Sequence, residues 1–191
     1  MEEKLKQISD RNSNCIKVVL YGPESTGKSS LAKELAKYYD TVYVEEFSRS
    51  YAETKAKDNL ELTKKDVLPI AVGQMHSENE QLKNANRVLI CDTDLLETKV
   101  YSEFYYNGFC PDLVQKYAQK NTYDLYFLTY IDILWEADGI RDQPNKRLQM
   151  FTAFEQALID SKKRYCIVKG SFEERLSICI TQIDELIKKA N

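Results

Sequence analysis

Histidine and closely spaced cysteines are nearly absent from this chain of 191 residues. Its only histidine is His76, and none of its five cysteines lies in a Cys-x-x-Cys pair. A single imidazole excludes zinc sites built mainly on histidine, and isolated cysteines are typical of buried, reduced thiols. We therefore expect neither a disulfide framework nor a site of the zinc-finger type.

The chain also lacks a surplus of basic charge and any long apolar run. With 27 Lys and Arg against 30 Asp and Glu, the formal net charge is -3, which does not favour nucleic acid as the main partner. The longest uncharged apolar run, 125–131, is far shorter than a membrane-spanning helix, which needs about 20 residues. Residues 1–6 are charged and lack the apolar core of a secretory signal. These absences predict a cytoplasmic protein without a nucleic-acid or membrane partner, and they leave its oligomeric state open.

Glycine is scarce as well, yet two of the six glycines stand where a phosphate-binding loop requires them. Residues 22–29 read Gly-Pro-Glu-Ser-Thr-Gly-Lys-Ser, a complete G-x-x-x-x-G-K-[ST] pattern. An apolar, β-branched stretch at 15–21 precedes the pattern, and a helical stretch at 28–39 follows it. This strand–loop–helix context predicts the binding of a nucleoside triphosphate.

The positions of this loop have separate expected roles. Its backbone N–H groups and the start of the following helix bind phosphate oxygens. Lys28 is expected to reach the β- and γ-phosphates, and the Ser29 hydroxyl is expected to bind Mg²⁺. The residues expected to contact the nucleotide are Gly22, Pro23, Glu24, Ser25, Thr26, Gly27, Lys28, Ser29 and Ser30.

Five apolar segments alternate with helical patterns along the chain. This alternation predicts an α/β fold, in which a parallel sheet lies between two layers of helices in one P-loop domain over 15–191. Residues 1–14 are polar and are expected to form an N-terminal arm or a short helix. Strands are expected at 15–21, 42–46, 87–92, 124–130 and 165–169, and helices at 28–39, 63–84, 94–107, from Pro111, at 145–161 and at 171–187.

Acidic side chains follow the expected strands. Since open parallel sheets bind ligands beyond the carboxyl ends of their strands, these acids are expected beside the phosphate loop. Asp92 ends a strand of the Walker B type and is expected to hold Mg²⁺, directly or through water. Glu46 is the candidate for activating an acceptor hydroxyl, and Asp94 is its rival, as base or as a ligand of sugar hydroxyls. Arg49 is expected to pair with a carboxylate or to contact the substrate.

The stretch after the fourth expected strand is rich in charge and carries the only tryptophan. Residues 132–147 are expected to form a small lid, in which arginines such as Arg141 bring positive charge to the transferring phosphoryl group. Trp135, beside this lid, offers a flat face for stacking on an aromatic base or a pyridinium ring, or for ordinary packing.

Together, these motifs resemble the nicotinamide-riboside kinase domain of the NadR family. They are Gly22–Ser29, Glu46-Phe47-Ser48-Arg49, Asp92-Thr93-Asp94 and Trp135-Glu136-Ala137-Asp138-Gly139-Ile140-Arg141, in an order and spacing that match from about Cys15 to Ile187. The resemblance implies a P-loop kinase with strand order 2-3-1-4-5 that uses ATP and Mg²⁺ to phosphorylate the 5′-hydroxyl of nicotinamide riboside, giving nicotinamide mononucleotide. By position it implies Lys28, Glu46, Asp92 and Arg141 as catalytic residues and Glu46, Arg49, Asp94, Trp135 and Asp138 as substrate-binding residues.

The chain departs from the usual NadR organisation in one respect. That family usually carries a DNA-binding module and a nucleotidyltransferase domain with a His-x-Gly-His motif, and neither fits in the 14 residues before the first strand. Repressor and adenylyltransferase activities are therefore expected to be absent. Two alternatives stay open, a kinase for another nucleoside or small hydroxyl acceptor, and an ATPase regulatory module. A GTPase is disfavoured, because Asn145-Lys146-Arg147-Leu148 lacks the Asp of the guanine motif.

Overall fold

The computed structural model describes residues 2–8, 15–133 and 146–190. Within these ranges a single parallel sheet has the strand order β2-β3-β1-β4-β5. The order 2-3-1-4-5 implied by the sequence motifs is therefore confirmed. The strands are β1 Ile16–Tyr21, β2 Tyr43–Val44, β3 Val88–Asp92, β4 Leu125–Thr129 and β5 Tyr165–Val168.

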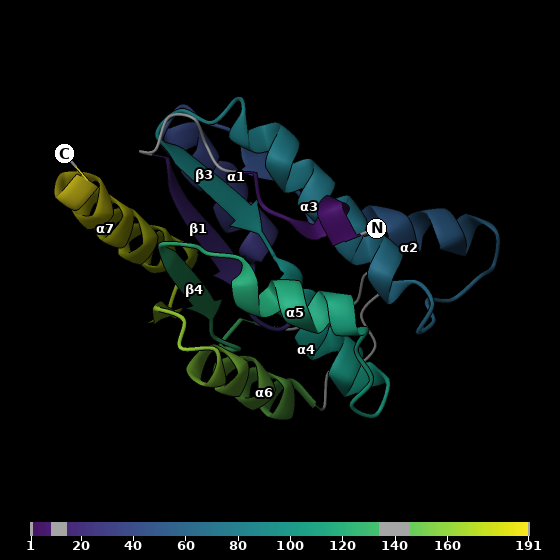
Figure 1. Ribbon diagram of the computed structural model, residues 1–191. Helices are drawn as coiled ribbons and strands as arrows, with labels where there is room; N and C mark the ends of the chain where they lie inside the picture. Colours follow the sequence, from purple (N-terminus) through teal and green to yellow (C-terminus); the bar gives the residue numbers. More distant parts are fainter. Residues whose placement is uncertain (1, 9–14, 134–145, 191) are drawn as a thin grey trace.

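Helices cover both faces of this sheet, which confirms the predicted three-layer α/β sandwich (Figure 1). Two of them, α1 and α7, pack on one face, while α3, α4, α5 and α6 pack on the other. The helices are α1 Lys28–Tyr38, α2 Phe47–Lys57, α3 Val67–Leu82, α4 Leu95–Tyr105, α5 Asp112–Lys120, α6 Arg147–Asp160 and α7 Phe172–Ala190.

The central strand β1 shows why its sequence is apolar at nearly every position. Val19 and Tyr21 contribute to the core cluster under α3 to α6, whereas Val18 and Leu20 contribute to the cluster under α1 and α7. Since successive side chains of a strand point to opposite faces, a strand covered on both faces must be apolar throughout. The same burial holds for β3 and β4, where every residue is buried.

The segment after β2 differs from its sequence prediction. The expected strand at 42–46 is a strand only at Tyr43–Val44, and the helix α2 begins at Phe47. No residue of α2 is buried, whereas α1 and α3 each bury residues of one face. The start of α2 is held by α3, where Gln74 Oε1 accepts a hydrogen bond from the Phe47 N–H at 2.8 Å. Gly73 makes this contact possible, because a Cβ at that position would overlap with the Phe47 ring.

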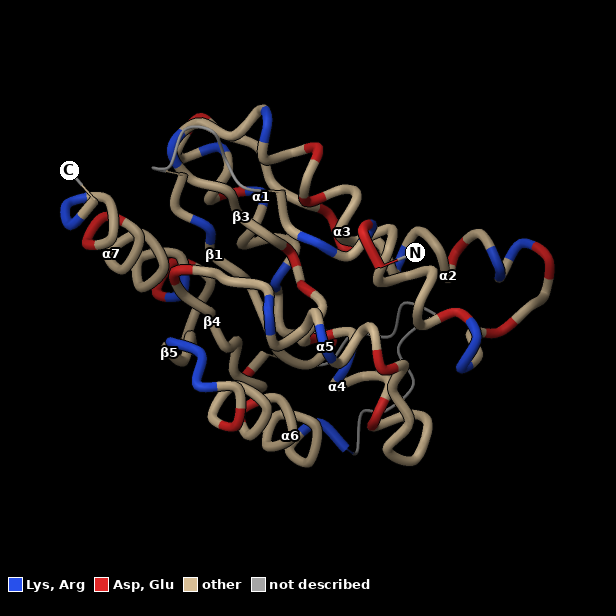
Figure 2. Tube along the Cα trace, in the orientation of Figure 1, with Lys and Arg blue, Asp and Glu red and all other residues tan. Residues whose placement is uncertain are grey.

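The loop between α2 and α3 is fastened by the carboxylate of Asp66. It accepts hydrogen bonds from Tyr51 Oη at 3.0 Å, from Lys55 Nζ at 2.7 Å, and from the backbone N–H and hydroxyl of Thr63 at 2.7 and 2.8 Å. Burial alone would raise the pKa of Asp66, but these donors lower it to about 2. Figure 2 shows that the loop otherwise carries charges of both signs. Asp66 therefore gives an otherwise solvated loop a fixed position beside α2.

The described part of the N-terminal arm packs against the domain. Its first residues form a short 3-10 helix, Glu2–Leu5, in which Leu5 is fully buried against α3 and α5. Glu2 accepts hydrogen bonds from Lys116 and from the Tyr117 hydroxyl of α5. Of the helices within the described residues, none is both long and apolar enough to cross a bilayer.

Candidate active site

The phosphate-binding loop joins β1 to α1, where the sequence predicts it. Its two glycines have positive φ angles of 134° at Gly22 and 81° at Gly27, which glycine adopts without steric cost. A Cβ at Gly22 would also lie 2.8 Å from Thr129 Oγ1 of β4. The Thr26 hydroxyl donates to the Pro23 carbonyl at 2.7 Å and lies 2.7 Å from the same Thr129 oxygen. These contacts fix the loop against the end of β4.

Two arginines hold the outer side of this loop through its carbonyl oxygens. The fully buried Arg175 of α7 donates to Thr26 O at 3.0 Å and to Tyr130 O at 3.0 Å. Arg147, at the start of α6, donates to Ser25 O at 3.2 Å. Arg175 could not be recognised from the sequence, because one arginine in an amphipathic helix gives no local signal. The loop therefore depends on the last two helices as well as on its own motif.

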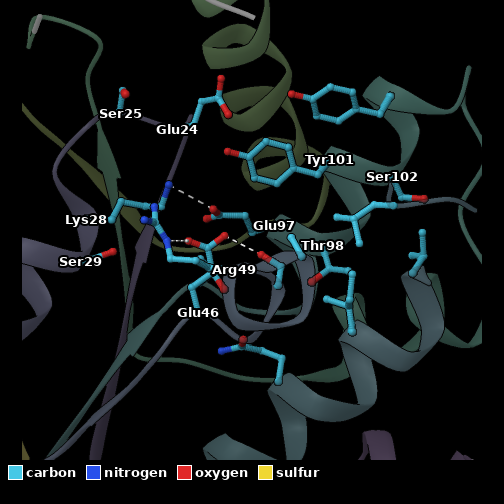
Figure 3. Close-up of a pocket in the computed structure, with 18 of the residues that line it drawn as sticks. Glu24, Ser25, Lys28, Ser29, Glu46, Arg49, Glu97, Thr98, Tyr101 and Ser102 are labelled. Carbon is cyan, nitrogen blue, oxygen red and sulfur yellow. Dashed lines mark hydrogen bonds and ion pairs between the residues drawn. The ribbon is translucent and has the colours of Figure 1, made fainter. Parts of the chain in front are cut away.

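Lys28 is buried and directed toward α4 (Figure 3). Its Nζ donates to the carbonyl oxygens of Gly22 and Pro23 at 2.7 and 3.0 Å and lies 3.2 Å from Oε1 of Glu97. Burial alone would lower the pKa of Lys28, but the surrounding carboxylates, Glu97 above all, raise it. The ammonium group is therefore held in its charged form inside the loop.

Glu97 is the residue of this site that the sequence analysis missed. It lies in the first turn of α4, is 1% exposed and faces the cavity described below. Its Oε2 accepts a hydrogen bond from the Gly22 N–H at 3.2 Å. Burial raises the pKa of the Glu97 carboxyl, whereas Lys28, 3.2 Å away, favours the carboxylate form. Acidic residues are common in the first turn of any helix, so the sequence offered no reason to single it out.

Asp92 ends β3 beside the phosphate loop, and the Ser29 hydroxyl lies near enough to its carboxylate to lower its pKa. Its Oδ1 is buried and has no hydrogen-bond partner among the residues that the structure describes. Burial and the nearby Glu46 raise the pKa of Asp92 to about 6, while Lys28 opposes them. A hydroxyl beside an incompletely bonded carboxylate oxygen fits a hard cation such as Mg²⁺. Because no group of three His, Cys, Asp or Glu ligands occurs in the described ranges, phosphate oxygens and water would supply the other ligands.

Glu46 precedes α2 and faces the same cavity. Its carboxylate accepts a hydrogen bond from the Ser48 hydroxyl at 2.6 Å and lies 4.0 Å from Arg49 Nε. Figure 3 shows Glu46, Arg49, Lys28 and Glu97 directed toward one another at one end of the cavity. Two carboxylates and two cations from three segments, the starts of α1, α2 and α4, therefore meet at this point.

Asp94, in contrast, lies in the core. It is fully buried, and its Oδ1 accepts from the Glu97 N–H at 3.0 Å, which caps α4. Its Oδ2 accepts from the Tyr126 hydroxyl at 2.8 Å. Asp94 is not among the residues that line the cavity, because an N-cap carboxylate turns back onto its own helix. Its predicted contact with sugar hydroxyls has no support in this geometry, whereas Glu97 of the same helix does line the cavity.

Three further residues of the sequence prediction cannot be placed. Trp135, Asp138 and Arg141 lie outside the described residues, together with most of the expected lid at 132–147. At the two ends of that range, Asp132 accepts a hydrogen bond from the Gly170 N–H, and Arg147 contacts the phosphate loop as described above.

A cavity of about 630 Å³ extends from the phosphate loop to a wall formed by α2, α3 and α4. On α4, one turn after Glu97, the rings of Tyr101 and Tyr105 stack with their centroids 6.1 Å apart and their planes at 20°. Leu60 and Val67 add apolar surface to the lining. Nε2 of Gln74, another residue of the lining, is buried and has no hydrogen-bond partner within the described part of the chain. A cavity of this size and character fits a small organic ligand beside a phosphate site.

Comparison with known proteins places this site in a family. Residues 17–175 match the family described as AAA domain. The chain belongs to this family. It is 27% identical over 176 residues to the trifunctional NAD biosynthesis/regulator protein NadR of Salmonella typhimurium strain LT2, a match that covers 89% of this chain and 42% of the relative. It is 32% identical over 125 residues to the NadR protein of Escherichia coli strain K12, covering 65% and 30%. The chain therefore spans less than half the length of these two curated relatives.

Solved structures show the same fold. A NadR protein in complex with NR superposes with a TM-score of 0.76 at 20% identity, over 93% of this chain and 52% of that chain. A NadR protein in complex with NAD and AMP-PNP gives 0.73 at 20% identity, over 92% and 50%. Deoxyadenosine kinase from M. mycoides with bound dCTP gives 0.59 at 16% identity, over 89% and 100%. The resemblance to NadR seen in the motifs is confirmed, and the fold is that of a P-loop kinase.

Proposed function

We propose that this AAA domain protein transfers a phosphoryl group from ATP to a nucleoside hydroxyl, and that the acceptor is the 5′-hydroxyl of nicotinamide riboside. The observation that carries the proposal is the continuous cavity, in which the phosphate loop opens directly onto Glu46 and the tyrosines of α4. A nucleotide-dependent switch requires no second compartment next to its phosphate site. The sequence similarity to NadR proteins, one of them solved in complex with NR, supports this choice of acceptor.

At the phosphate end, the backbone of residues 24–30 and the start of α1 would bind phosphate oxygens. Lys28 supplies positive charge where negative charge develops on the transferring group. Ser29 and Asp92 would hold Mg²⁺, which neutralises phosphate charge when it is bound. The motif residues that precede Lys28 keep their proposed role as the nucleotide-binding loop.

At the acceptor end, Glu46 orients the acceptor hydroxyl and takes its proton as the bond from oxygen to the γ-phosphorus forms. The bond from that phosphorus to the β–γ bridging oxygen breaks, and the electron pair leaves with the nucleoside diphosphate. Arg49, 4.0 Å from Glu46, keeps the carboxylate directed into the cavity. Tyr101 and Tyr105 offer aromatic surface to the base, and such surface attracts a cationic pyridinium ring.

The expected lid completes the proposal on the strength of its motif. Arg141 would add positive charge to the transferring phosphoryl group, while Trp135 and Asp138 would contact the riboside. A cytoplasmic location and the lack of a nucleic-acid partner also stay predictions.

The test is an assay of the purified chain with MgATP and a panel of ribosides, in which ADP is followed by a coupled enzyme and the product by mass spectrometry. Nicotinamide riboside is expected to give nicotinamide mononucleotide with the highest kcat/KM of the panel. Phosphorylation of another nucleoside in preference would overturn the choice of acceptor. ATP consumption without any phosphorylated acceptor would instead favour an ATPase module.

A further inference from the structure

Glu97 faces the phosphate loop but takes no part in the proposed transfer. Its side chain is only 2% exposed, and its two oxygens have different partners. One lies 3.2 Å from Lys28 Nζ, and the other accepts from the Gly22 N–H, also at 3.2 Å. The carboxylate therefore interacts with two groups of the phosphate loop at once, the Lys28 ammonium and the Gly22 N–H.

The charges around Lys28 determine how strongly its contact with Glu97 competes with a phosphate group. Besides Glu97, both Glu46 and Asp92 act on the lysine with negative charge, and Arg49 is the nearby cation beside Glu46. Opposite charges at about 3 Å attract strongly when water is excluded. A phosphate group that approaches Lys28 must therefore compete with a carboxylate that is already in place. If the lysine turns to the phosphate, Glu97 is left buried beside other negative groups, which is costly.

We propose that Glu97 is a positioning residue that acts through Lys28, as a built-in counter-anion that holds the lysine before the nucleotide binds and lowers the affinity for the nucleotide. The buried lysine then stays compensated in the nucleotide-free protein. The same competition shortens the lifetime of bound ADP, because the ion pair between Glu97 and Lys28 forms again when the diphosphate leaves. This inference rests on the proposed nucleotide binding and adds to it a determinant of affinity.

A purely structural role for Glu97 would consist of tying α4 to the first glycine of the loop. E97Q separates the two roles, because glutamine keeps the size of the side chain and an oxygen acceptor for the Gly22 N–H but removes the charge. Glu78 of α3 provides a matched control. It is 1% exposed, accepts hydrogen bonds from Tyr123 Oη at 2.7 Å and Gln7 Nε2 at 2.8 Å, and does not line the cavity.

The experiment is a calorimetric titration of wild type, E97Q and E78Q with MgADP and with Mg-AMP-PNP. We expect E97Q to bind both nucleotides more tightly, with a Kd lower by about tenfold. E78Q is expected to stay within about twofold of wild type. A role limited to tying α4 to the loop predicts unchanged or weaker binding in E97Q, so the direction of the change distinguishes the two roles.

Equal or weaker nucleotide binding in folded E97Q overturns the inference while leaving the proposed kinase intact. Should circular dichroism show that E97Q does not fold, E97D serves instead, since its shorter side chain keeps the charge but withdraws it from Lys28. The inference then requires tighter binding in E97D by a smaller factor, and unchanged binding overturns it. If the folded wild type binds neither nucleotide, the proposed function fails and the inference fails with it.

Discussion

The two ends of the cavity are built in different ways. The phosphate end comes from one contiguous motif, whose backbone is fixed by glycine conformation and by buried contacts from Thr129 and Arg175. The acceptor end is assembled from side chains of three separate helices, α2, α3 and α4. The contrast implies that changes at the phosphate end abolish transfer, whereas changes at the acceptor end alter the choice and affinity of the acceptor.

The largest effect is expected from Lys28→Met. Loss of the ammonium group should lower phosphoryl transfer by about 10²- to 10³-fold. It also leaves Glu97 buried without its partner, so we expect a loss of stability of about 3 kcal/mol. Steady-state assays and urea unfolding measure the two effects. In the double variant K28M/E97Q the stability should return while the activity does not. A double variant as unstable as K28M would show that the ion pair is not the cause.

The next effect concerns the packing of α2 on α3. Gly73→Ala places a methyl group in the Phe47 ring, so α2 must move or the ring must leave its site. We expect a loss of stability of about 1 to 3 kcal/mol and a higher KM for the acceptor, with the Kd for ATP unchanged. Thermal unfolding and initial-rate kinetics give these values. The variant F47A/G73A restores the space and should recover part of the stability, and an equal rise of both KM values would contradict the separation of the two ends.

A smaller effect is expected from Asp66 and depends on pH. Its pKa is lowered to about 2 in the folded protein from an ordinary value of 3.8, so its contribution to stability is present above pH 4 and is lost as the pH falls toward 2. D66N should be less stable than wild type by about 1 to 2 kcal/mol at pH 7. The difference should shrink below pH 4. Urea unfolding across this range measures it, and a difference that does not vary with pH would exclude the carboxylate as its source.

The smallest effect is expected at Gln74. Q74E keeps the oxygen that accepts from the Phe47 N–H but replaces the buried Nε2 donor, which has no partner within the described residues. If this donor binds the acceptor, the acceptor KM should rise by about fivefold to tenfold, which corresponds to one hydrogen bond. The KM for ATP should not change. An unchanged acceptor KM would remove Gln74 from the acceptor site.

The contrast between the two ends also separates what the sequence predicts from what it does not. The positions of Gly22 to Ser29 after β1 and of Asp92 at the end of β3 could be predicted because each depends on residues adjacent in the chain. The strand order came instead from the resemblance to the NadR family. The helix α2 was missed because none of its residues is buried, so the burial of an apolar face does not dictate its sequence. Asp94 was expected at the site and Glu97 was not considered, since spacing alone does not tell which acid caps a helix and which faces a cavity.

Arg175 determines when, during synthesis, the nucleotide loop can reach its final conformation. The hydrogen bond from its guanidinium to the Thr26 carbonyl joins residues 149 positions apart. On the ribosome the nucleotide loop emerges long before α7 does, and it lacks this donor until α7 has been synthesised. We therefore expect nascent chains that stop before α7 to have no measurable affinity for ATP, although they contain the whole loop motif.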